Sequence, residues 1–198
     1  MHFDFKSLMG GLAVAIMLLA YDVQLLRISE GKSKPHPIAW FGFGFLTGIG
    51  YFVQHQKDAG PGSWVMGLTA IFCFVIAGAS HLKNPRRLDE FDRWDWAALV
   101  LGIGLFALYL ISKNLSWGPT VSAILATSAD VVLYVPIFRQ LEKEYAPAYG
   151  LNSLKFVPSL FAMNTYSTAT CIYPVTMVII NGISVVLINQ KKKVLGIT

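Results

Sequence analysis

Long apolar stretches separated by short polar connectors dominate the pattern of this chain. A helix that spans a bilayer needs about 20 mostly apolar residues. Seven stretches meet this requirement, so the pattern predicts an all-α integral membrane protein with seven transmembrane helices in one domain, residues 1–198. The predicted helices cover residues 7–27, 38–55, 63–82, 95–112, 118–139, 151–168 and 171–190.

The composition agrees with a membrane protein. Hydrophobic residues make up 55% of the chain and charged residues only 14%, and the mean hydropathy is +0.54. An average soluble domain has about 25% charged residues. The first apolar stretch has no small-residue cleavage site after it, so we interpret it as a helix of the domain rather than a signal peptide. We therefore expect the protein to lie in a lipid bilayer, that of the cell (inner) membrane.

Basic residues gather in alternate connectors. If seven helices span the membrane, one side receives twelve of the 16 Lys and Arg residues and the other side three. Cytoplasmic loops carry such an excess, which predicts an N-terminus outside and a C-terminus in the cytoplasm. Because topology accounts for the net charge of +5, we expect no nucleic-acid partner. The twelve residues are Arg27, Lys32, Lys34, Lys83, Arg86, Arg87, Arg93, Arg139, Lys143, Lys191, Lys192 and Lys193.

A weak internal repeat favours a 3+1+3 arrangement. Glu30 and Glu144 follow the first and fifth predicted helices 114 residues apart, and Pro61 and Pro174 begin the third and seventh 113 apart. One extra helix between two triplets would make them parallel repeats, a plan used by several transporters. The first triple-helix bundle would cover about residues 1–82, the linker helix 95–112 and the second bundle 118–190.

The last third of the chain resembles a known family. The stretches "YVPIFRQLEKEYAPAYGL" and "YPVTMVIINGISVVLIN" look like the three-helix unit of the SWEET and SemiSWEET sugar transporters and the wider PQ-loop (MtN3-like) group. Pro136, Arg139 and Lys143 match the proline and the basic positions of the unit, and Asn181 matches its mid-helix asparagine. Ile137 departs from the pattern, since that position is Gln in the family. The chain is thus similar to a divergent member.

The resemblance implies alternating-access transport with a solute cavity between the two bundles. It implies that Asn181 contacts the solute and that residues of the neighbouring helices face the same cavity. Those residues would be Asn164, Thr165 and Tyr166 before the seventh helix and Tyr51 and Gln54 in the second.

Asp130 lies near the middle of the fifth predicted helix. A charged acid at that depth costs roughly 2.5–3.5 kcal/mol, so such residues face a cavity or a partner. Two readings remain open: a neutral acid in a structural hydrogen bond, or a protonatable group that binds solute and couples transport to protons.

Three residues are candidates for a gate or hinge. Asp22, five residues before Arg27, predicts either a local ion pair or a gate contact at the inner mouth. Pro136 and Pro158 predict either static kinks or a hinge, and we place both near the cytoplasmic side. Lys155, about one turn into the sixth predicted helix, is expected to extend to the interface. The tryptophans, Trp40 included, are expected to anchor at the interface because they lie near helix starts.

No Ser/His/Asp set, nucleotide-binding loop or metal cluster occurs in the sequence. We therefore expect no enzyme, no cofactor and no metal. The favoured function is a facilitator, open to proton coupling, for a small polar solute such as a sugar or vitamin-like molecule. The alternative is a non-transporting membrane receptor or sensor of the PQ-loop plan. The oligomeric state is left open, a homo-oligomer included.

Overall fold

Helices make up the regular secondary structure of this protein. The structure is a computed structural model that describes residues 4–85, 93–112 and 114–196. Those ranges contain no β-strand, and the all-helical prediction is confirmed for them. In chain order the elements are α1 (Phe5–Ser29), α2 (Pro37–Gln56), η1 (Gly60–Ser63), α3 (Trp64–Lys83), α4 (Arg93–Ser112), α5 (Gly118–Val132), α6 (Tyr134–Arg139), η3 (Leu141–Lys143), α7 (Ala146–Phe161) and α8 (Thr168–Val194).

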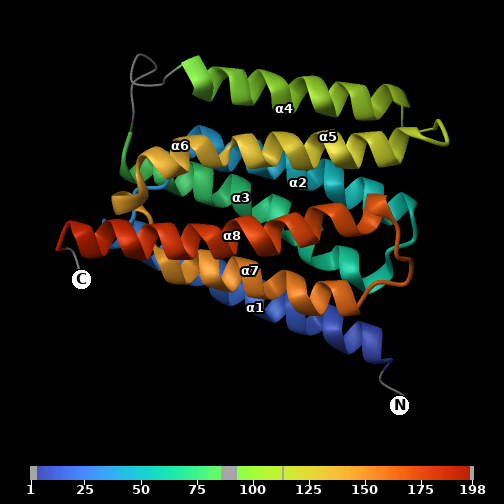
Figure 1. The fold of residues 1–198 in the computed structure, drawn as a ribbon, viewed down its shortest axis with the longest axis horizontal. Helices are drawn as coiled ribbons and strands as arrows, with labels where there is room; N and C mark the ends of the chain where they lie inside the picture. Colours follow the sequence, from blue (N-terminus) through green and yellow to red (C-terminus); the bar gives the residue numbers. More distant parts are fainter. Residues whose placement is uncertain (1–3, 86–92, 113, 197–198) are drawn as a thin grey trace.

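The long helices lie side by side, and the N- and C-termini are at opposite ends of the bundle (Figure 1). α3 packs against both α1 and α2, and α8 packs against both α5 and α7. We call α1–α3 the first group and α5–α8 the second group. The groups meet where α1 packs against α7 and where α2 packs against α5. α4 lies outside both groups, against α2 and α5 (Figure 1).

Four helical segments of the described chain are long and apolar enough to cross a membrane: Phe5–Ser29, Gly60–Lys83, Gly118–Arg139 and Thr168–Val194. Large apolar side chains such as Leu19, Ile71, Ile111 and Ile179 are exposed on the outside of the bundle. An apolar exterior around apolar helices is the arrangement that lipid favours and water does not. These features indicate an integral membrane protein.

The fifth predicted helix is divided in two. α5 ends at Val132 and α6 begins at Tyr134, with Leu133 between them. Proline has no N–H, so Pro136 in α6 cannot donate to the carbonyl of Val132, and the helix is interrupted just before it. The side chain of Pro136 lies outside the described part of the structure. The described chain therefore has eight α-helices where the sequence predicted seven.

The sixth predicted helix is displaced toward the N-terminus. The sequence predicted residues 151–168, but α7 runs from Ala146 to Phe161. Pro147 occupies its first turn, where the missing N–H costs nothing. The shift places Lys155 in the middle of α7 rather than near its start.

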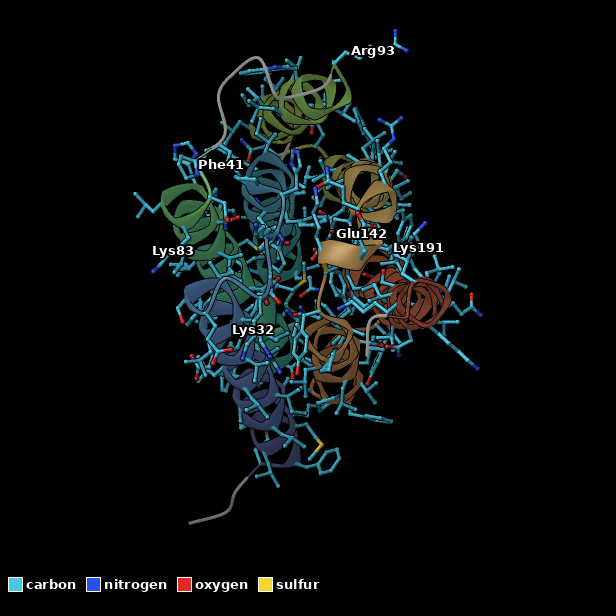
Figure 2. The ribbon with its side chains drawn as sticks, turned by 90° about the vertical axis from the view of Figure 1, so that its left-hand side faces the viewer. Lys32, Phe41, Lys83, Arg93, Glu142 and Lys191 are labelled. Atoms are coloured by element: carbon cyan, nitrogen blue, oxygen red, sulfur yellow. The ribbon has the colours of Figure 1, made fainter. Side chains whose placement is uncertain are left out.

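One end of the bundle collects the basic connectors. Figure 2 looks onto this end, and Lys32, Lys83, Arg93 and Lys191 lie around it. We call it the basic end. The Lys32 ammonium lies 2.9 Å from the Glu30 carboxylate, and its hydrogen bond lowers the pKa of Glu30. Arg86 and Arg87, which the sequence assigns to the same end, lie outside the described residues.

Gly10 of α1 shows how closely the backbones approach. A Cβ added at Gly10 would lie 2.9 Å from the carbonyl oxygen of Pro61 in η1, so the backbone would have to move. At the adjacent Gly11 a Cβ would meet nothing within 4 Å. Gly10 therefore leaves no room for a side chain, whereas the adjacent Gly11 does.

We expect Gly10→Ala to lower the free energy of unfolding by about 1–3 kcal/mol through overpacking. Gly11→Ala should be neutral or stabilise by up to about 1 kcal/mol, because glycine weakens a helix interior. Thermal unfolding of the purified protein in detergent measures both. Equal effects of the two substitutions would contradict this packing of α1 on η1.

Candidate functional site

A small cavity lies between the first and second groups. Its volume is about 30 Å³, enough for one or two water molecules. Both polar and aromatic side chains line it, and they come from seven helices, α1–α3 and α5–α8. The lining residues are Tyr21, Trp40, Phe43, Thr47, Thr69, Cys73, Asp130, Tyr134, Tyr149, Asn152, Lys155, Phe156, Tyr173, Met177 and Asn181.

Asp130 of α5 is the acidic residue of this cavity. It is buried, and its Oδ2 accepts a hydrogen bond of 2.9 Å from the Tyr173 hydroxyl. The Tyr173 oxygen lies 2.7 Å from Thr47 Oγ1, and Thr47 donates because Tyr173 has already given its proton to Asp130. This chain joins α5 through α8 to α2. It therefore crosses from the second group to the first.

Lys155 of α7 is the basic residue of the cavity. It is also buried, and its Nζ donates to the Tyr21 hydroxyl at 2.7 Å and to Thr69 Oγ1 at 2.9 Å. The nitrogen lies 4.5 Å from the centre of the Tyr21 ring and 5.0 Å from that of Phe156. An aromatic face attracts a cation. Lys155 therefore links α7 to α1 and α3, again across the two groups.

The two opposite charges do not touch. Asp130 and Lys155 line the same cavity and interact electrostatically, but the described side chains include no direct ion pair between them. Cys73, Tyr134 and Tyr173 line the same cavity, and of these three Tyr173 is hydrogen-bonded to Asp130. Each charge is thus held by neutral hydroxyl groups, with the cavity between them.

Several polar atoms of the lining lack a partner. Asp130 Oδ1, Asn152 Oδ1 and the indole Nε1 of Trp40 are buried without a hydrogen bond. Buried polar atoms are almost always hydrogen-bonded, and unsatisfied ones call for an explanation. Asn181, by contrast, donates from Nδ2 to the Met177 carbonyl of its own helix at 2.8 Å. The unsatisfied atoms mark a place where a bound molecule or water would complete the bonding.

Direct contacts join the two groups at the basic end. The Arg27 guanidinium donates to the Tyr145 hydroxyl at 3.2 Å and lies 4.5 Å from the centre of the same ring. The backbone N–H of Lys34 lies 3.4 Å from the carbonyl of Lys143. These contacts join the α1–α2 region to the segment that leads into α7.

A second set of contacts joins the groups at the opposite end. The backbone N–H of Asn164 donates to the carbonyl of Ala59 at 3.0 Å. Ser159 Oγ donates to the Gly62 carbonyl at 2.8 Å, and Gln54 Nε2 donates to the Thr170 carbonyl at 2.7 Å. The two groups are therefore joined by direct contacts at both ends of the bundle.

The structure brings together some of the predicted binding residues and separates others. Asp130 and Asn181 line the cavity. Gln54 lies outside the lining and pins α2 to the start of α8. Tyr51 faces away, into an outer groove between α2 and α3. Asn164, Thr165 and Tyr166 are exposed in the α7–α8 connector, because α7 ends at Phe161.

The gate and hinge predictions need correction. Asp22 is exposed on the outer face of α1, and Arg27 pairs with Glu30 instead. Pro136 in α6 lies toward the basic end, whereas Pro158 lies near the far end of α7 (Figure 1). The two prolines therefore do not share one end of the second group, since α7 starts five residues earlier than predicted.

Sequence reasoning missed Lys155, Trp40 and Asn152 as cavity residues. Trp40 is buried and contacts the rings of Tyr21 and Phe43, so it does not anchor at the interface. A lysine between apolar residues in a membrane segment was the available indication for Lys155. The displaced helix boundary concealed it.

No protein-family model, curated protein or solved structure matches this chain. Within the described residues no cluster of three or more His, Cys, Asp or Glu side chains could hold a metal ion. The chemistry of the cavity therefore has to be read from its own side chains.

Tyr173→Phe should lower the free energy of unfolding by about 1–3 kcal/mol, because it leaves Asp130 and Thr47 without their shared partner. Tyr166→Phe removes a hydroxyl that bonds the Leu160 carbonyl at the surface, and we expect a change within about 0.5 kcal/mol. Chemical unfolding in detergent measures both. Similar losses of unfolding free energy in both variants would show that the buried Asp130–Tyr173–Thr47 hydrogen bonds stabilise the protein no more than a surface hydrogen bond does.

Proposed function

We propose that this protein is a membrane transporter that moves a small polar solute by alternating access. One observation supports this most strongly: a cavity lined by an acidic residue and a basic residue lies at the contact between two helix groups. Ionisable side chains inside a membrane domain are costly and usually mark a solute or ion pathway. The unsatisfied atoms of Asp130 and Asn152 are the groups that a solute would engage.

The proposal includes a 3+1+3 plan of parallel repeats, as in SWEET-like transporters. Its support is the packing pattern: the third helix of each group, α3 or α8, lies against both other long helices of that group. The groups also exchange equivalent contacts, α1 with α7 and α5 with α2. Such a pattern is expected of two similar units related by an axis along the membrane normal, with α4 as the linker.

We further propose that the basic end faces the cytoplasm of the cell membrane and that the N-terminus lies outside. The support is the positive charge of the connectors at that end (Figure 2). In this orientation the contact between Arg27 and Tyr145 is the inner gate, and that between Ala59 and Asn164 is the outer gate. Transport would break one set of contacts while the other holds.

Solute counterflow in proteoliposomes tests the function directly. We expect exchange of at least one class of small polar solute, and no exchange by empty liposomes. A folded protein that binds a solute without exchanging it would instead support the receptor alternative. A folded protein that neither binds nor exchanges any solute would overturn the proposal.

Cross-linking either gate should stop transport. Lys34→Cys with Lys143→Cys would join the basic end, and Ala59→Cys with Asn164→Cys the opposite end, since the backbones of each pair are hydrogen-bonded. We expect each disulfide alone to abolish counterflow and a reductant to restore it. The background carries Cys171→Ser, while the buried Cys73 is kept. Full counterflow with either gate cross-linked would rule out alternating access through these gates.

Asp130 is the candidate for proton coupling. Asp130→Asn should remove the dependence of uptake on a proton gradient, because the amide cannot exchange a proton. Uptake is measured at saturating solute with and without the gradient. The control is Asp22→Asn, an exposed acid of α1, which should behave as the wild type. An unchanged gradient dependence in Asp130→Asn would exclude this role.

A further inference from the structure

The cavity presents one basic and one acidic side chain to the same small space. Lys155 and Asp130 are both buried, and each is held by hydroxyl groups rather than by the other. A direct ion pair between them would compensate both charges and leave no charged group available to bind a solute. Keeping them apart leaves two separate half-sites of opposite sign.

Each half-site has unused bonding capacity. A lysine ammonium has three donors, and the hydroxyls of Tyr21 and Thr69 accept two of them. On the other side, Asp130 Oδ1 has no partner, and neither does Asn152 Oδ1. The free donor suits a carboxylate, and the free acceptors suit an ammonium group.

The remaining lining suits a small ligand with little polar surface between its charges. Tyr134, Phe156 and Trp40 contribute aromatic surface, and their faces attract cations. An uncharged polyol would leave a buried carboxylate and a buried ammonium without a partner of opposite charge, which is unfavourable inside the bundle. A solute with a single charge would compensate only one of them.

We propose that the transported solute is a small zwitterion of the α-amino acid type, with its carboxylate at Lys155 and its ammonium group at Asp130 and Asn152. This inference rests on the proposed transport function and narrows its substrate class. The cavity of about 30 Å³ is smaller than any such solute. The site therefore widens when one gate opens, and it contracts around Lys155 and Asp130 after the solute has left.

A solute panel on the unmodified full chain provides the first test. Reconstituted protein is assayed for counterflow and for thermal stabilisation, since binding raises apparent stability. The panel contains glycine and L-alanine as zwitterions, D-glucose and sorbitol as uncharged polyols, and acetate and methylammonium as single charges. We expect exchange and stabilisation with the zwitterions only.

Two matched pairs of variants provide the second test. Lys155→Met and Asp130→Asn should each weaken the apparent affinity for L-alanine by about 30-fold or more, since each removes one of two buried charge contacts. Lys83→Met and Asp22→Asn change exposed residues and should bind as the wild type does. If a cavity variant does not fold, the panel on the unmodified chain decides.

The outcomes separate the inference from the function on which it rests. Exchange of glucose or sorbitol without exchange of the zwitterions overturns the substrate class and leaves the transporter proposal in place. Stabilisation by zwitterions without exchange supports the binding site and overturns transport. Neither exchange nor stabilisation by any solute overturns both.

Discussion

The cost of holding two opposite charges inside an apolar helix bundle governs this structure. Hydrocarbon offers no hydrogen bonds, so every polar group at that depth needs a partner within the protein. Lys155 finds two hydroxyls on α1 and α3, and Asp130 reaches α2 through Tyr173. The partners of Lys155 lie on the opposite group, and Asp130 reaches the opposite group through Tyr173, so bonding these two side chains also joins the groups.

The contacts at the two ends differ in character from those at the centre. At the ends, the groups are joined by hydrogen bonds of guanidinium, hydroxyl, amide and backbone groups, and a typical hydrogen bond contributes about 0.5–1.5 kcal/mol. At the centre, a lost partner leaves a charge without compensation, at a far higher cost. In the proposed transport cycle, opening one end while the central hydrogen bonds stay formed would cost less than breaking the central ones, and a bound solute would replace the central partners when they separate.

Hydrophobic pattern was sufficient to place most helices and to identify Asp130, because a lone acid in an apolar stretch stands out whatever the tertiary packing. It could not place Lys155, since that residue's depth depends on where α7 begins, and the polar segment before it belongs to the helix. Trp40 lies near a helix start, as interface anchors do, but packing against Tyr21 buries it. Family spacing placed Tyr166 in the cavity, and the shorter α7 leaves it in a connector. The errors of the sequence-based prediction therefore lie mainly in where the helices begin and end, rather than in the type of element.

The shortness of α7 has a consequence for the surrounding lipid. It has 16 residues, and at 1.5 Å per residue its length is about 24 Å, less than the roughly 30 Å of a typical hydrocarbon core. Lipid beside a short helix has to thin, or the helix has to be shielded by longer neighbours. α1 and α8, with 25 and 27 residues, both pack against α7 and would shield it from lipid on two sides. The mismatch between bilayer thickness and helix length would therefore act on α7, the helix that carries Lys155. Bilayers whose lipids have longer or shorter acyl chains would strain this helix to different extents.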